Sequence, residues 1–276
     1  MLLVSAITIC LGVTYMNSAR LVHEFERTVE SKDFEPEAES LELAEIDRNS
    51  HRGWKITAAR SSGDSKLEVV DAEEVEAQIF DDENKVKMVV KASKAKVNRA
   101  SGITYLEGRP EALLIERNTK LIADQFVIKS GQPIDAVGNV KILLKPDGSN
   151  YINAEKAVIT QALDDITLYS VSQSPVANNL LLSGGVLRIE HSSKGAGAKP
   201  QRIIVSNGAW VKNGSTTCRS ARLDVLLDSN GNPSLATFTG SPVANQSGKE
   251  IRASKIEYSL PSGKVKASGQ VQSNFI

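Results

Sequence analysis

The feature that most constrains the fold is a six-residue phrase that recurs along the chain at a nearly fixed period. Successive copies begin 31, 31, 66 and 33 residues apart, and a degenerate copy at 187–190 lies midway through the gap of 66. A period of this size indicates an array of similar structural units stacked on one another. The copies are residues 92–97, 123–128, 154–159, 220–225 and 253–258.

A second phrase, an apolar alternation that ends at a glycine, follows most copies. The glycines are Gly108, Gly138, Gly208, Gly240 and Gly269. Turn-forming residues separate the phrases at 98–102, 129–132, 229–233 and 261–263. Each unit is therefore predicted to be a strand, a turn and a return strand. Glycine at one point of each return strand favours a sharp bend from one sheet to another. The unit after Ala154 departs from this rule, because 170–174 contains no glycine.

Alternation within the units assigns side chains to two faces of a sheet. Phe126 and Ile128 share one face of their strand, and the apolar positions of 134–144 share one face of the next. The last unit repeats the pattern at Ile256, Tyr258 and Leu260. A long sheet with one apolar face must fold over or pair with a second sheet to cover that face. The prediction is an all-β fold of folded-over antiparallel sheets, elongated along the repeat.

Composition narrows the function. The chain carries 33 basic and 33 acidic residues, so no electrostatic field favours nucleic acid, and none is predicted as a partner. Aromatic residues make up 5% of the chain, which leaves an interior lined mainly by Ala, Val, Ile and Leu. Cys10 lies in an N-terminal apolar run, away from Cys218, so no internal disulfide is predicted.

The N-terminal residues suggest a membrane anchor followed by a spacer. Residues 1–22 carry no charge before Arg20 and are predicted to be a transmembrane helix. A cleaved signal peptide with Ala19 at the cleavage position is the alternative. Residues 23–52 are rich in acidic side chains and read as a solvated spacer, with a helix suggested near 41–46. Residues 53–276 are then predicted to form the repeat domain.

An aliphatic interior that runs lengthwise suits acyl chains, which bind through buried area. The alternative is a core that packs only against itself. A third hypothesis is an envelope polymer that assembles through open sheet edges. Under the lipid hypothesis the predicted contact residues are Phe126, Ile128, Ile134, Val140, Ile142, Ile159, Leu168, Leu223, Val225, Phe238, Ile256 and Tyr258.

Three segments resemble a known family. The phrase at 54–59 (WKITAA) and the segment 67–77 are similar to the LptC family of lipopolysaccharide export, and 248–271 is similar to the related OstA/LptA repeat. The resemblance covers most of 54–276, and the chain looks like an enlarged LptC. It implies an open, V-shaped β-jellyroll that carries lipopolysaccharide, held by a single-pass anchor in the inner membrane with its bulk in the periplasm.

The resemblance also implies partners at the two ends of the sheet. An N-terminal edge at 54–58, with Trp54 and Ile56, would pair with an inner-membrane ABC transporter. A C-terminal edge at 264–271, with Val265 and Val271, would pair with an LptA-like bridge protein.

No enzymatic activity, cofactor or metal is predicted. The three histidines, His23, His51 and His191, are far apart in the sequence. The acidic runs 81–83 and 164–165 lie where turns between strands are expected, and Asp favours such turns for backbone reasons.

Overall fold

The computed structural model describes residues 37–38, 41–47, 52–63, 68–81, 83–116, 118–129, 131–144, 148–160, 163, 165–177, 180–191, 200–228 and 232–275. Its 21 strands are β1 (Glu37–Ala38), β2 (Leu41–Asp47), β3 (Arg52–Gly63), β4 (Val69–Phe80), β5 (Val86–Asn98), β6 (Ile103–Glu107), β7 (Glu111–Leu114), β8 (Thr119–Ile122), β9 (Gln125–Lys129), β10 (Ile134–Leu143), β11 (Tyr151–Ile159), β12 (Ile166–Ala177), β13 (Leu180–His191), β14 (Pro200–Asn213), β15 (Thr216–Leu227), β16 (Pro233–Thr239), β17 (Val243–Gln246), β18 (Lys249–Arg252), β19 (Lys255–Ser259), β20 (Lys264–Ser268) and β21 (Gln272–Phe275).

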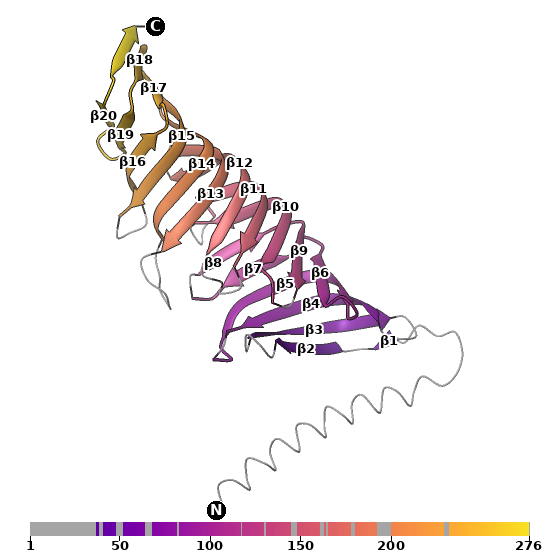
Figure 1. The fold of residues 1–276 in the computed structure, drawn as a ribbon. Coiled ribbons are helices and arrows are strands. Elements are labelled where there is room, and N and C mark those ends of the chain that lie inside the picture. The colour runs from indigo at the N-terminus through magenta and orange to yellow at the C-terminus, as the bar shows by residue number, and fades with distance from the viewer. Residues whose placement is uncertain are drawn as a thin grey trace, which may run out of the picture.

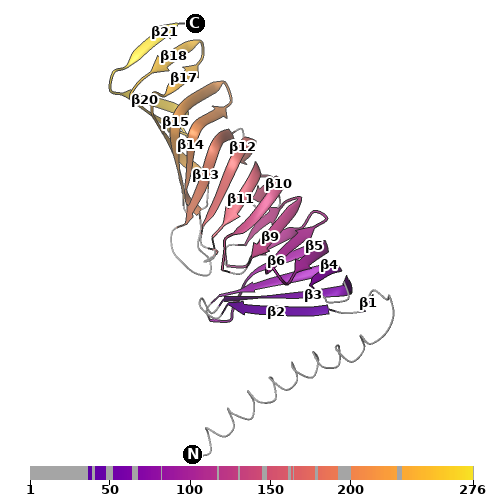
Figure 2. The ribbon, with the colours of Figure 1, turned by 45° about the vertical axis from the view of Figure 1, so that its right-hand side comes forward.

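The strands stack side by side into an elongated, twisted array. It runs from β1–β5 at one end to β17–β21 at the other (Figure 1), and the same order is seen after rotation (Figure 2). Neighbouring strands pair antiparallel from β3 through β20. The predicted all-β antiparallel architecture is confirmed for the described residues.

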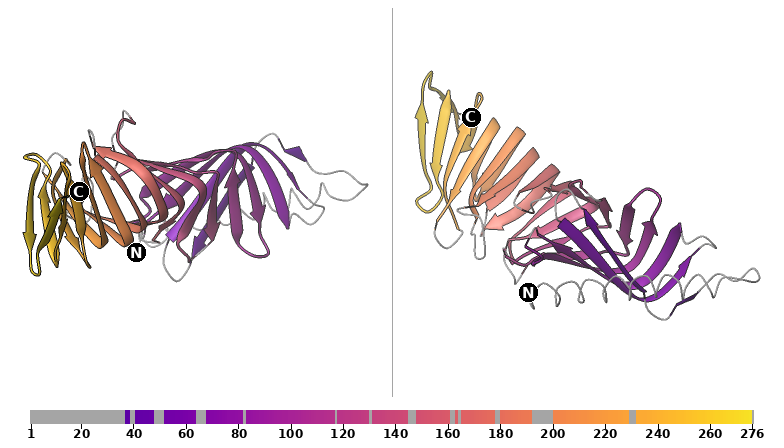
Figure 3. Two further views of the ribbon diagram at one scale, coloured as in Figure 1. Left: turned by 90° about the horizontal axis from the view of Figure 1, so that it is seen from above. Right: turned by 60° about the horizontal axis from the view of Figure 1, so that its bottom comes forward.

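Almost every layer of the stack belongs to two sheets. In β5, residues 94–98 pair with β6, whereas 88–91 pair with β7. β10 likewise pairs with β9 on one side of Gly138 and with β8 on the other. We call the sheet that contains β6, β9, β16, β19 and β20 sheet I. We call the one that contains β2, β7, β8, β17, β18 and β21 sheet II. Long strands turn from one into the other, as Figure 3 shows from two further directions.

The recurring phrase marks this bend. Its first residue is small and buried in each copy, and the second is exposed. The next inward side chain comes three positions after the first residue, and the alternation then continues in steps of two, as at Ala92, Ala95 and Val97 in β5. Alanine or serine is needed at the first position because the inner corner between the two sheets has little room. These corner residues are Ala92, Ala123, Ala154, Ser220 and Ala253.

The return-strand glycines complete the bend, as the sequence predicted. Gly240 has φ of +77° between β16 and β17, and its carbonyl accepts a hydrogen bond of 3.2 Å from the backbone N of Ala221. A Cβ added to Gly240 would lie 2.6 Å from the Cβ of Ala221. Gly138 lies against Asp124 in the same way. At Gly138 and Gly240 glycine is therefore required both for its backbone conformation and for close approach, whereas Gly208 has φ of +91° with open space around it.

The unit without glycine solves the bend differently. Ser170 in β12 takes φ of +55° in place of a glycine. Beyond it the register shifts between Val171 and Ser174. In sheet II the backbone N of Asn153 donates to Ser174 Oγ at 2.8 Å, and that hydroxyl donates to the carbonyl of Ser172 at 2.8 Å. A buried side chain thus supplies the acceptor that a backbone carbonyl supplies elsewhere.

The sheet begins earlier than the sequence predicted. Residues 41–47, expected within an acidic spacer and as a helix near 41–46, form β2, which pairs with β3 from Leu41↔Ala58 to Asp47↔Arg52. β1 pairs with the other end of β3. Leu41 and Leu43 pack on the core, whereas Glu42 points outward and its Oε1 forms an ion pair with Lys55 Nζ at 2.8 Å. The acidic composition of the segment made this alternation hard to recognise in the sequence. The expected anchor at 1–22 lies outside the described residues.

The bend geometry predicts the effect of adding one methyl group at Gly240. Gly240→Ala should destabilise the fold by about 2–4 kcal/mol, because a left-handed backbone and a clash with Ala221 add together. Gly102→Ala is the matched control, since Gly102 has φ of +63° but open space around it, and should cost about 1–2 kcal/mol. Chemical denaturation measures both. Equal losses in the two variants would show that close approach at the bend does not matter.

Candidate functional site

The inner surface of sheet I presents a continuous row of apolar side chains next to the bend, which we call the near-bend row. Each member is the direct cross-strand partner of the next, over thirteen successive residues from β4 to β20. The near-bend row is Ala72, Ala95, Leu106, Phe126, Ala136, Ala157, Leu168, Leu187, Val205, Leu223, Phe238, Ile256 and Ala267.

A second row of sheet I lies one step further from the bend. It is built almost entirely from β-branched residues, including Val97, Ile128, Ile159, Ile203 and Val225. β-Branched side chains pack well on a pleated surface, which explains why the sequence uses them here. The two rows give sheet I an inner surface of aliphatic side chains along the stack.

The structure brings all twelve predicted contact residues into this interior. Each is at most 5% exposed. Ten belong to sheet I, and Val140 and Ile142 lie in the sheet II half of β10.

The opposite wall, from sheet II, was largely not predicted from the sequence. Its inward row includes Ala112, Leu121 and Ile152, and continues at Leu182 and Val211. The half-strands that carry these residues are short, such as the four-residue β7 and β8. Apolar residues alternate in these half-strands as well, but an alternation over only four residues is too short to identify a strand reliably.

Sheet II also contributes a cysteine to the interior. Cys218 in β15 is buried between Val211 and Ala244 of the neighbouring strands. Burial raises the pKa of its thiol to about 12. The nucleophilic thiolate is therefore scarce at neutral pH, and the residue serves as a small apolar side chain.

Among the described residues, two side-chain hydrogen bonds cross between the sheets on the side opposite the bend. Asn213 Nδ2 at the end of β14 donates to the Tyr258 hydroxyl of β19 at 3.0 Å. Gln246 Nε2 of β17 donates to the carbonyl of Gly263 at 3.3 Å. Both lie toward the C-terminal end of the stack, where they tie the margins of sheets I and II to each other.

The described strands that end the stack differ from the prediction at one end. β3, with Trp54 and Ile56, was expected to be the N-terminal edge, but β2 pairs with it, so this expectation is wrong. β2 is the outermost described strand of sheet II there. At the other end β20 and β21 pair on one side with β19 and β18. Val265 lies in β20, whereas Val271 lies between β20 and β21 and is 53% exposed.

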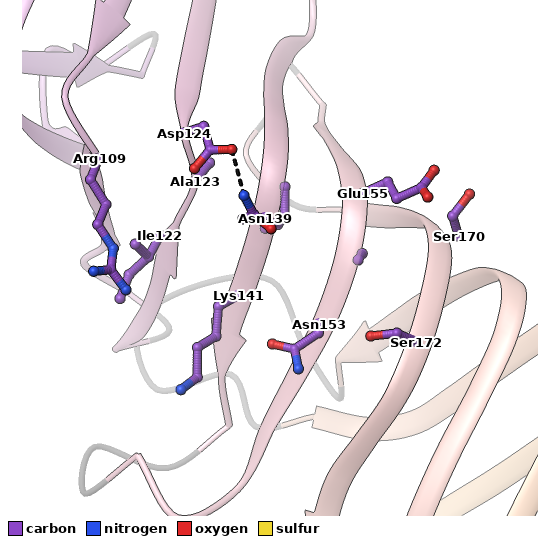
Figure 4. Close-up of a pocket in the computed structure, with 12 residues that line it drawn as sticks. Arg109, Ile122, Ala123, Asp124, Asn139, Lys141, Asn153, Glu155, Ser170 and Ser172 are labelled. Atoms are coloured by element: carbon purple, nitrogen blue, oxygen red, sulfur yellow. Dashed lines mark hydrogen bonds between the residues drawn. The ribbon is translucent and has the colours of Figure 1, made fainter.

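A polar hollow of about 670 Å³ lies on the outer side of the bend between β6 and β12 (Figure 4). Asn139 Nδ2 donates to Asp124 Oδ2 at 2.7 Å in its centre. Lys141 Nζ lies 3.9 Å from the centroid of the Tyr151 ring. The basic groups of the lining, Arg109 and Lys141, are matched by two carboxylates, so its charge favours no ion of either sign.

The acidic turn at 81–83 has a structural role. Asp81 accepts backbone hydrogen bonds from Glu83 and Lys85 and pairs with Lys87 Nζ at 3.1 Å. Partial burial opposes ionisation, but these bonds and the lysine outweigh it and lower the pKa of Asp81. Among the described residues no group of histidine, cysteine and acidic side chains is arranged to hold a metal ion. His191 ends β13, while His23 and His51 lie outside the described part.

No helix within the described ranges is long and apolar enough to cross a membrane. No protein-family model matches the chain, and no curated protein matches it either. Among solved structures it is similar to LptH from Pseudomonas aeruginosa, described as the LptA homologous periplasmic component of the lipopolysaccharide transport device. The two share 12% identity over 59% of this chain and 97% of that chain, with a TM-score of 0.33. Membership in the LptC/LptA family stays a prediction from the sequence.

Burial of Cys218 predicts its reactivity. In a Cys10→Ser variant, the folded protein at pH 8 should react with Ellman's reagent at least about a hundredfold more slowly than the same chain in guanidinium, because both the thiolate and access are lacking. The reaction is followed by the absorbance of the thiolate that the reagent releases. Labelling of the folded protein at the unfolded rate would mean that solvent reaches the inner wall of sheet II.

Proposed function

We propose that this chain binds the acyl chains of a lipid between sheets I and II and passes the lipid along the stack. The near-bend row carries the proposal, because its thirteen rungs offer apolar contacts of similar kind without a polar interruption. A hydrocarbon chain binds such a surface through buried area, with about 0.8 kcal/mol for each methylene removed from water. Because the contacts are similar at every rung, the hydrocarbon chain could move along the row without meeting a position of much stronger binding.

The arrangement of the sheets supports entry of a ligand from the side. Every long strand runs continuously from sheet I into sheet II, so the backbone itself joins the two sheets at the bend. The sheets therefore cannot separate on that side. On the opposite side the described residues of the two sheets are joined by side-chain hydrogen bonds such as that from Asn213 to Tyr258. A bond of this kind contributes about 0.5–1.5 kcal/mol, which binding of a few methylenes can offset.

We propose lipopolysaccharide as the cargo and a bridge in the periplasm as the setting. In this proposal residues 1–22 anchor the chain in the inner membrane with a single pass. The edge formed by β1 and β2 pairs with an inner-membrane ABC transporter. The edge formed by β20 and β21 pairs with an LptA-like bridge protein. Unpaired backbone groups of an outer strand favour such additions.

A structural scaffold with a self-packed core is the second candidate. The close burial of the interior favours it, since Ile142, Leu168 and Phe238 are fully enclosed by neighbouring side chains. Under this alternative the two walls stay together and the interior takes up no lipid.

Photo-crosslinking in cells separates the two candidates. A crosslinking amino acid at Phe126, Ile142 or Ile256 should capture lipopolysaccharide, because these side chains face the interior. Lys141 is the matched control, since it neighbours Ile142 in β10 but faces outward. Immunoblotting for the lipid adduct gives the result. Capture from Lys141 alone, or from none of the positions, would favour the scaffold.

A further inference from the structure

Within the described part of the chain, two polar atoms face the aliphatic interior without a hydrogen-bond partner. Thr104 in β6 is 1% exposed, and its Oγ1 has neither donor nor acceptor within reach. Trp54 in β3 packs against the core, and its buried Nε1 likewise has no acceptor. Buried hydroxyl and indole N–H groups normally find a partner, so each of these atoms requires an explanation.

Packing does not explain the hydroxyl of Thr104. The residue lies in the β-branched row of sheet I, with Val97 and Ile128 as its cross-strand partners. Valine has the same shape and would fill this position without an unpaired polar group. Trp54 lies on sheet II, in line with the inward residue Ile56 of the same strand. Sheets I and II thus each present one unpaired group to the interior.

The two remaining unpartnered buried atoms of the described residues differ in position. Arg202 Nε and Asn245 Oδ1 belong to outward-facing residues, next to the inward Ile203 and Ala244. Only Thr104 Oγ1 and Trp54 Nε1, among these four atoms, face the space where the proposed lipid lies.

The chemistry of the pair limits the ligand. An indole N–H only donates, and a threonine hydroxyl can donate, so both fit an acceptor oxygen. A carboxylate or phosphate would lose its hydration in an aliphatic interior with no cation beside it, at high cost. An uncharged carbonyl oxygen is the acceptor that such a site tolerates. Ester and amide links carry one where an acyl chain joins its head group.

Building on the proposed lipid-binding function, we propose that Thr104 Oγ1 and Trp54 Nε1 donate hydrogen bonds to the carbonyl oxygens of ester- or amide-linked acyl chains. The pair distinguishes acyl lipids from alkyl ethers of equal length. β4 and β5 separate β3 from β6, which is about 14 Å along the stack at ~4.8 Å per strand. The two residues therefore meet different carbonyls, and their effects should add.

The test uses two lysophosphatidylcholines at concentrations below micelle formation. One carries a palmitoyl ester and the other a hexadecyl ether, and each displaces a fluorescent fatty probe from the purified full chain. The unaltered protein should bind the ester about 3- to 10-fold more tightly, as expected for one or two added hydrogen bonds. Thr104→Val and Trp54→Phe should each reduce this ratio and leave the ether affinity unchanged.

Two controls keep the result interpretable. Thr237→Val changes an outward-facing threonine of sheet I and should leave the ester-to-ether ratio as it was. Thr104→Val should unfold at the same or a higher denaturant concentration, since it loses no hydrogen bond within the protein. Equal binding of ester and ether by the unaltered protein would overturn this inference alone. Binding of neither lipid would overturn the proposed function with it.

Discussion

The two sheets share one bend, and the packing at this bend determines the geometry of the whole stack. At most layers a strand turns from sheet I into sheet II where its backbone meets little bulk on the inside and closely approaches the next strand. Alanine or serine at the corner leaves room inside, and glycine in the left-handed region allows the close approach, as at Gly138 and Gly240. The hydrogen bonds from Asp124 and Ser254 to Gly138 and Gly269 fix the register between units.

Repeating this bend at every layer determines the interior. Two sheets fastened along one line bury their inner faces against each other, and each added unit lengthens the same apolar surface. The interior therefore offers equivalent rungs along its length, which suits a ligand that is itself a repeating chain. The same geometry concentrates separable contacts on the side away from the bend, where Asn213 meets Tyr258.

The sequence was sufficient for the features that repeat. The period, the turns, the inward faces of β9 and β10 and the role of the glycines were all predictable from alternation and spacing. It failed where the signal was short or opposed by composition. The acidic side chains of β2 concealed its alternation, and the short half-strands of sheet II concealed the second wall. The unpaired atoms of Thr104 and Trp54 could not be foreseen, because the absence of a partner is a property of packing in three dimensions.

Uptake of an acyl chain in the proposed way requires sheets I and II to separate on the side away from the bend. Spin labels at Gln132, on the margin of sheet I, and Ile115, on the margin of sheet II, would report this directly by pulsed electron resonance in a Cys10→Ser, Cys218→Ala background. The distance between them should grow when palmitoyl lysophosphatidylcholine binds, while the distance from Gln132 to a label at Ser101 on the same sheet stays constant. Lipid binding with both distances unchanged would mean that the sheets do not separate.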